Sequence, residues 1–260
     1  MPKFAANLTM LFNEHPFLER FAAAAQAGFK AVEFLFPYDF EAATIHEALQ
    51  ANNLTLVLHN LPAGNWAGGE RGIACDPARI NEFREGVAKA ITYAQALNCP
   101  QLNCLAGIVP PENATTARAI LVENLGFAAV ALQKAGLNLL LEPVNTQDIP
   151  GFFVNRSAQA LEIINEVAAP NLKLQYDIYH SQIMEGNLAR TIETNLAQIG
   201  HIQLADNPGR FEPGTGEINY HYLFNKLDAL GYTGWIGCEY KPTTTTADGL
   251  GWLAAHHIKL

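Results

Sequence analysis

The chain has 260 residues, 49% of them hydrophobic and only 16% charged, with a formal net charge of −9. This length and apolar content suffice for one large core, so we expect a single domain over residues 1–260. The negative charge disfavours phosphate backbones and anionic membrane surfaces as partners. Four cysteines without CxxC spacing, and no charged leader before an apolar signal core, predict a reduced, cytoplasmic protein. The apolar stretches fall short of the roughly 20 residues of a membrane helix.

Short apolar runs alternate with longer helical patterns along the whole chain, which is typical of successive βα units. We expect strands over residues 3–9, 31–36, 54–59, 101–105, 137–142, 172–177, 201–204 and 235–239. Helical patterns lie between them, over residues 16–27, 45–52, 77–97, 115–135, 157–167, 181–198 and 220–230, with a closing segment over 247–257. Glycines 28, 136, 200 and 231 follow predicted helix ends, where a left-handed stop is typical.

Eight such units predict an α/β fold, a (β/α)8 TIM barrel. An open doubly wound sheet uses the same parallel strands and stays the alternative, although the chain lacks a glycine-rich nucleotide fingerprint after the first strand. Two connections, 60–76 and 205–219, are longer than the others. Since the loops that follow barrel strands form the catalytic face, we expect them to contribute a lid and a substrate pocket.

Four of the predicted buried strands end in polar side chains, namely Glu142, Asp177, Gln203 and Glu239. A carboxylate at the exit of a buried strand has no packing role, and the last four strands of a barrel are neighbours around its mouth. Three carboxylates and an amide carbonyl suit Mg²⁺ or Mn²⁺ better than a structural zinc. Each residue alone would be interpreted as a hydrogen-bonding group, but together they predict a divalent metal site.

Other polar residues near these strand ends are candidates for binding a substrate. His180 lies three residues after Asp177; an isolated histidine there commonly caps a helix, but beside an ion it would polarise a substrate oxygen or hold a ligand in place. His59 ends the third predicted strand. Ordinary surface charges are the alternative for the basic residues that we consider for a substrate carboxylate, Arg71, Arg210 and Lys241.

Five segments in chain order together resemble hydroxypyruvate isomerases: NLTMLF (7–12), HNLPAG (59–64), GERGIA (69–74), YDIYH (176–180) and GTGEINY (214–220). The resemblance covers nearly the whole chain and is strongest to the branch named for 2-oxo-tetronate isomerase, in the xylose-isomerase-like barrel superfamily. It implies that Glu142 and Glu239 act as paired acid/base carboxylates and that Asp177 and Gln203 complete the metal shell. Sugar 3-epimerases of that superfamily usually have histidine where Gln203 stands, so the identity of the ion does not carry over.

The resemblance and the residues together predict a metal-assisted isomerase that shifts the carbonyl of a short 2-oxo sugar acid, 2-oxo-tetronate, through a cis-enediolate. Alternatives are hydroxypyruvate isomerisation to tartronate semialdehyde, ketose 3-epimerisation and a non-catalytic sugar-acid-binding protein. A metal-dependent endonuclease on the same barrel is disfavoured by the negative charge and the carboxylate-rich ligand set. Self-association through the outer helices stays open.

Overall fold

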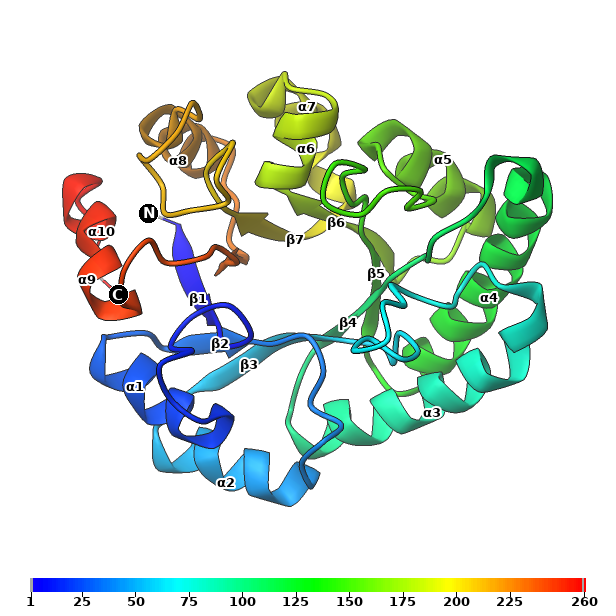
Figure 1. The fold of residues 1–260 in the computed structure, drawn as a ribbon, viewed down its shortest axis with the longest axis horizontal. Coiled ribbons are helices and arrows are strands. Elements are labelled where there is room, and N and C mark those ends of the chain that lie inside the picture. Colours follow the sequence, from blue (N-terminus) through cyan, green and yellow to red (C-terminus); the bar gives the residue numbers. More distant parts are fainter. Residues whose placement is uncertain (1, 259) are drawn as a thin grey trace.

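The structure, a computed structural model, describes residues 2–258 and Leu260. Its strands close into a barrel in chain order (Figure 1). They are β1 (Lys3–Asn7), β2 (Ala31–Glu33), β3 (Thr55–Asn60), β4 (Gln101–Cys104), β5 (Asn138–Leu141), β6 (Leu172–Asp177), β7 (Ile199–Leu204) and β8 (Trp235–Cys238). Neighbouring strands are parallel and β8 pairs with β1, so the predicted (β/α)8 barrel is confirmed.

Helices lie outside the barrel (Figure 1). The α-helices are α1 (Arg20–Gln26), α2 (Ala42–Ala51), α3 (Ile80–Ala96), α4 (Ala114–Lys134), α5 (Ser157–Val167), α6 (Ile178–Met184), α7 (Leu188–Asn195), α8 (Tyr220–Ala229), α9 (Thr246–Gly249) and α10 (Gly251–Ala255). The 3-10 helices are η1 (Phe17–Glu19), η2 (Pro77–Arg79), η3 (Pro111–Asn113) and η4 (Leu196–Gln198). The prediction of one helix over 181–198 is wrong, because Gly186 and Asn187 have φ values of 63° and 51°, which a right-handed helix does not continue through.

Three of the four glycines that were predicted to end helices do so, and one does not. Gly28, Gly136 and Gly231 have the positive φ of a left-handed helix stop. Gly200 instead lies inside β7, where an added Cβ would come 2.6 Å from Leu140 Cδ2 and 2.9 Å from Lys173 Cβ. The missing side chain therefore gives room to a neighbouring strand.

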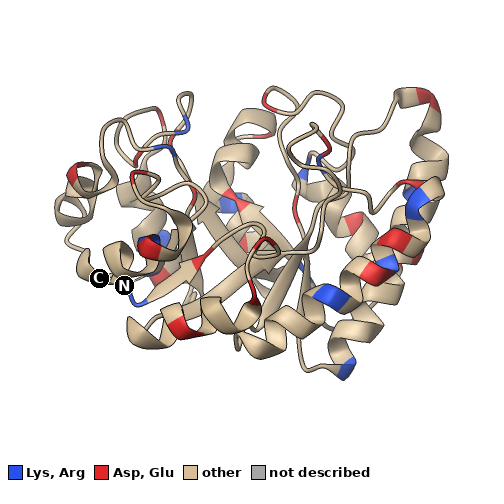
Figure 2. Ribbon diagram, turned by 60° about the horizontal axis from the view of Figure 1, so that its bottom comes forward, with Lys and Arg blue, Asp and Glu red and all other residues tan. Residues whose placement is uncertain are grey.

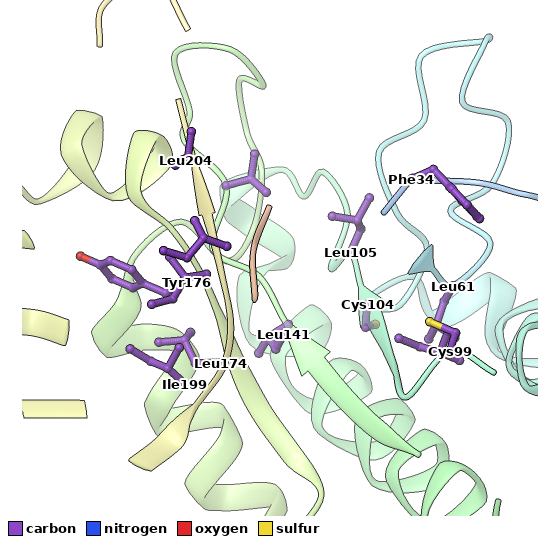
Figure 3. Close-up of a cluster of buried hydrophobic side chains, with 14 of the residues drawn as sticks. Phe34, Leu61, Cys99, Cys104, Leu105, Leu141, Leu174, Tyr176, Ile199 and Leu204 are labelled. Atoms are coloured by element: carbon purple, nitrogen blue, oxygen red, sulfur yellow. The ribbon is translucent and has the colours of Figure 1, made fainter. Parts of the chain in front are cut away.

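Side chains of the strands alternate between the layer under the helices and the barrel interior. In β5, Leu139 and Leu141 belong to the large core, whereas Leu140 belongs to a small cluster with Ala5, Ala31, Val57 and Leu58. Figure 3 shows part of the large core, with Leu141 and Leu174 among its labelled side chains. Further buried strand residues are polar and hydrogen-bond to one another across the barrel, as Glu33 of β2 does with His201 of β7. This polar interior positions the candidate site.

The segment Pro111–Lys134 is long and apolar enough to cross a membrane by length and composition alone, with a mean hydropathy of 1.3. In the fold, its helix α4 packs against α3, α5 and β5, and Leu121, Leu125 and Leu132 are fully buried. Acidic and basic positions are interspersed over the outer helices (Figure 2). The apolar side of α4 thus covers the barrel.

Alanine substitutions at two glycines should change stability in opposite directions. Gly126 lies inside α4 with nothing within 4 Å of an added Cβ, so Gly126→Ala should raise the free energy of unfolding by about 0.5–1 kcal/mol. Gly200→Ala should lower it by about 1–3 kcal/mol, because the methyl group overlaps Leu140. Urea unfolding at one pH measures both values. Equal effects would contradict the close packing at Gly200.

Candidate active site

Three carboxylates meet at the carboxyl ends of β5, β6 and β8. Glu142 follows β5, Asp177 ends β6 and Glu239 follows β8, and all three are buried. One ligand atom from each, together with one from His180, lies within 4.8 Å of all the others. The structure thus brings together the three carboxylates that the sequence pattern singled out. Gathering like charges in a dry interior sets the electrostatics of the site.

The proximity and burial of these carboxylates raise their pKa values. Burial is the largest cause for Glu142, followed by the charge of Asp177, and together they raise its pKa to about 8. The pKa of Glu239 is raised well above its ordinary value, again first by burial; the charges of Glu142 and Asp177 add to this and Arg210 opposes it. Without further positive charge, Glu142 therefore keeps a proton at neutral pH.

Arg210 places a guanidinium among the carboxylates. Its Nη2 donates to Glu239 Oε2 at 2.9 Å and lies 4.0 Å from Asp177 Oδ2, and its guanidinium stacks over the Tyr179 ring at 5.1 Å. Burial alone would lower the pKa of Arg210, but the charges of Glu239 and Asp177 outweigh it and raise the pKa. Arg210 is therefore a permanent cation inside the cluster.

The loop that carries Arg210 is held by one buried carboxylate. Asp206 accepts hydrogen bonds from the backbone N–H groups of Asn207 (2.9 Å), Gly214 (2.8 Å), Gly216 (3.0 Å) and Ile218 (3.1 Å). The sequence marks this region as turn-rich but does not reveal that Asp206 organises it. The many backbone contacts fix the path of the loop around Arg210.

His180 has a defined tautomer. Asn145 Oδ1 accepts the backbone N–H groups of Gln147 (3.0 Å) and Asp148 (2.8 Å), which turns Asn145 Nδ2 toward His180 Nδ1 at 2.6 Å. Burial lowers the pKa of His180 to about 4, so the ring is neutral, and since Nδ1 accepts, the proton sits on Nε2. That N–H lies 3.7 Å from Asp177 Oδ2. His180 is thus prepared to donate a hydrogen bond in the site.

The site fits a divalent cation in two respects. Asp177 Oδ1 accepts from the backbone N–H groups of Tyr179 and His180, but its buried Oδ2 has no hydrogen-bond partner among the described residues. A separate cavity of about 10 Å³, the room of one water-sized sphere, is lined by apolar side chains and by the polar residues Asn7, Glu33, Asn60, Glu142, Gln175, Gln203 and Glu239. These carboxylate and amide oxygens are the donors that Mg²⁺ and Mn²⁺ prefer.

The other candidate binding residues lie in different places. His59 is fully buried, with Nδ1 3.2 Å from Asn60 O, and burial lowers its pKa to about 4. Arg71 stacks over Trp66 at 4.3 Å and lines a separate cavity of about 560 Å³. Lys241 is exposed and lines another cavity, of about 410 Å³. Of the three basic candidates, only Arg210 contacts the carboxylates in the described structure.

Buried polar residues that the sequence interpretation did not select surround the carboxylates. Asn103 Nδ2 donates to Glu142 Oε2 at 2.7 Å, and Asn7 Nδ2 donates to Glu239 Oε1 at 3.2 Å. Glu33 is 1% exposed and hydrogen-bonds to Asn7, His201 and Gln203. Glu33 follows the apolar pair Ala31-Val32, and a carboxylate after an apolar run is the same pattern that singled out Glu142. The sequence could therefore also have predicted Glu33 as a site residue.

Residues 21–256 match the family described as xylose isomerase-like TIM barrel. The chain is 55% identical over 254 residues to the hydroxypyruvate isomerase of Escherichia coli, covering 97% of this chain and 98% of the relative. It is 51% identical to the 2-oxo-tetronate isomerase of Cupriavidus necator, with the same coverage. A solved Brucella melitensis structure described as an AP endonuclease of family 2 is 47% identical, with a TM-score of 0.96, and the match covers 98% of this chain and 99% of that chain.

The chain therefore belongs to the xylose isomerase-like TIM-barrel family and, within it, to the hydroxypyruvate isomerase family. It is an isomerase of the intramolecular-oxidoreductase type.

Cation-free protein should lose stability as the pH rises from 6.5 to 8. Folded Glu142 keeps its proton up to a pKa of about 8, whereas the unfolded chain releases it above 4.5, so the folded state binds more protons in this window and rising pH favours unfolding. The lowered pKa values of His59 and His180 act mainly below pH 6.5. The expected loss in the free energy of unfolding is on the order of 1 kcal/mol.

Urea unfolding in EDTA at the two pH values measures this loss. Glu142→Gln should reduce the dependence, because the amide does not titrate and Glu239 is then the remaining glutamate of the site with a raised pKa. A wild-type protein that gains stability over this interval would show that Glu142 does not hold its proton.

Proposed function

We propose that the protein interconverts 2-oxo-tetronate and 3-oxo-tetronate by a 1,2-carbonyl shift. The observation that carries the proposal is the meeting of Glu142 and Glu239 with Asp177 and a buried guanidinium at the strand ends. In the reaction the proton on C3 leaves, a cis-enediolate forms, and a proton is returned to C2, while the hydroxyl proton on O3 is exchanged for one on O2. The named relatives support a sugar-acid isomerase in general.

Glu142, Asp177, Gln203 and Glu239 would hold a divalent cation, Mg²⁺ or Mn²⁺. Bound there, the cation would supply a Lewis acid for the carbonyl and hydroxyl oxygens of the substrate. The unpartnered Asp177 Oδ2 and the small cavity that Gln203 shares with both glutamates support this ligand set. His180 also has an atom near the carboxylates, but its Nε2 carries the proton, so we assign it the role of a donor.

Proton transfer requires a base at one carbon and an acid at its neighbour. We assign these roles to Glu142 and Glu239, because both follow strands whose ends meet at the site, β5 and β8, and because burial raises the pKa of both carboxyl groups. His180 Nε2–H would hydrogen-bond a substrate oxygen, and the Arg210 guanidinium would bind the substrate carboxylate. His59 is neutral, fully buried and lines none of the cavities described above, so we assign it no contact with the substrate. We propose a small sugar acid, rather than nucleic acid or membrane, as the partner of a cytoplasmic enzyme.

Hydroxypyruvate is the second candidate substrate, because the E. coli hydroxypyruvate isomerase has the higher identity, 55% against 51%. The two reactions need the same acid, the same base and the same cationic partner for the substrate carboxylate. The two substrates differ in the length of their carbon chains. Epimerisation at C3 of a neutral ketose is the third candidate; it would leave the carbonyl in place and give Arg210 no anion to bind. The endonuclease description of the Brucella protein is not carried over, since the net charge of −9 opposes DNA binding.

Proton NMR in D2O with Mg²⁺- or Mn²⁺-loaded protein tests the reaction. With 2-oxo-tetronate we expect 3-oxo-tetronate to appear with deuterium at the exchanged carbon, and Glu142→Gln or Glu239→Gln to lower kcat by about 10²–10⁴-fold, the range of a lost general acid or base. Turnover of hydroxypyruvate alone would move the assignment to that substrate. Binding without exchange of the carbon-bound proton would exclude an isomerase acting on these acids.

Substitution of Arg210 tests the carboxylate partner. Arg210→Met should raise KM for the acid by about 10–100-fold, because one charge-assisted pair is lost. Lys241→Met removes the same charge from an exposed side chain that lines a different cavity, and should change KM by less than about threefold on the same reasoning. A larger effect at Lys241 than at Arg210 would reverse the assignment.

A further inference from the structure

Glu33 is a buried carboxylate for which the proposed reaction has no direct use. It ends β2, which is separated from β8 by β1 in the closed barrel, and is 1% exposed. It accepts from Asn7 Nδ2 (2.9 Å) and Gln203 Nε2 (2.7 Å) on Oε1, and from His201 Nε2 (2.6 Å) on Oε2. Three donors from β1 and β7 therefore converge on one side chain of β2.

The acceptor character of Glu33 decides how the neighbouring amides point. Gln203 must turn its NH2 group toward Glu33, so its Oε1 faces the other way, where Gln175 Nε2 donates to it at 2.6 Å. Hydrogen bonding from Gln175 also lowers the pKa of Glu142. A chain of amides thus runs from Glu33 through Gln203 and Gln175 to Glu142.

A second branch leads from Glu33 to the other glutamate. Asn7 Oδ1 accepts the backbone N–H of Thr9 at 3.0 Å, so Asn7 Nδ2 is left to bridge Glu33 Oε1 and Glu239 Oε1. Asn7, Glu33, Gln203 and both glutamates line the same small cavity. One carboxylate is thereby connected through amides to both proposed acid/base residues.

The backbone of β8 makes room for this arrangement. Gly237 pairs in register with Gln203, and a Cβ at Gly237 would overlap both carboxylate oxygens of Glu33. Its φ is not in the left-handed region, so the close approach of Glu33, and not the backbone conformation, accounts for glycine at this position.

We propose that Glu33 is a positioning residue that turns the Gln203 carbonyl oxygen toward the cation cavity and holds Asn7 against Glu239. The inference rests on the proposed function for the cation that Gln203 would bind. Glu33 itself is not assigned as a ligand, because it is not part of the cluster of Glu142, Asp177, His180 and Glu239, and its carboxylate is held by three donors from β1 and β7. Its effect reaches the cation through the orientation of a ligand, as partners behind metal ligands commonly act.

Mn²⁺ binding to the full chain, followed by the electron paramagnetic resonance signal of free Mn²⁺, tests this role without substrate. Glu33→Met removes the acceptor that Asn7 Nδ2 and Gln203 Nε2 share, so neither amide is held in its orientation, and the Kd for Mn²⁺ should rise about 10–100-fold. Glu212→Met is the matched control: Glu212 is 3% exposed and accepts from Thr243 N at 2.9 Å, in the loop after β7 and away from the cavity. Its Kd should stay within twofold of wild type.

Gly237→Ala separates orientation from charge, since it displaces the Glu33 carboxylate while leaving its charge in the chain. It should weaken Mn²⁺ binding to a similar degree, and adding Glu33→Ala to it should weaken binding little further. Circular dichroism establishes that each variant is folded. If Gly237→Ala does not fold, Glu33→Met against Glu212→Met decides the question, and if Glu33→Met does not fold, Gly237→Ala decides it.

The proposal is overturned if folded Glu33→Met binds Mn²⁺ within twofold of wild type, or if wild type binds no Mn²⁺. The same samples, assayed for isomerisation, keep the two proposals distinct. Wild type that binds Mn²⁺ but turns over neither acid, with binding weakened in Glu33→Met, would refute the substrate assignment and support the role of Glu33. Active wild type with unaffected binding in Glu33→Met would do the reverse.

Discussion

Repulsion between buried carboxylates is the constraint on which the rest of this site depends. Glu142, Asp177 and Glu239 bring three negative charges together, and Arg210 returns one positive charge. Full ionisation would leave an excess of two negative charges, which a divalent cation offsets. Without it, burial and mutual repulsion raise the pKa values of both glutamates. The charge balance therefore supports the proposed cation site, in addition to the choice of ligand atoms.

The fold can hold this unfavourable arrangement because the strands carry two separate layers of side chains. Leu139 and Leu141 face the helices, where a large apolar core stabilises the barrel, while Glu142 at the next position belongs to the polar mouth. The apolar core between the strands and the helices thus provides most of the burial that stabilises the fold. The barrel interior is left free for polar groups, whose desolvation is offset by hydrogen bonds across the strands.

The barrel and the three carboxylates could be predicted from the sequence because both leave a local signal: an apolar run, and a charge where it stops. Residues of the interior were harder to recognise. Gln175 and His201 lie within largely apolar strands. Because these strands are short, the alternation of inward and outward side chains repeats too few times to show which residues face the barrel interior. Arg210, and not Arg71 or Lys241, reaches the carboxylates because of the path of its loop. Asp206 fixes that path through hydrogen bonds to backbone groups further along the chain, such as those of Gly214 and Ile218, and no periodicity in the sequence encodes such contacts.

Hydrogen bonding also distinguishes Glu239, to which we assign proton transfer, from Glu33, to which we do not. Glu33 is bound by three donors from strand residues, so neither of its oxygens can be freed without disturbing β1 or β7. Glu239 is bound on Oε2 by Arg210, whose side chain comes from a loop. A substrate carboxylate that engages Arg210 would release that oxygen for proton transfer, in whichever direction Glu239 transfers the proton. In the proposed mechanism, anion binding therefore also prepares Glu239 for its role, and a neutral sugar would not bring this about.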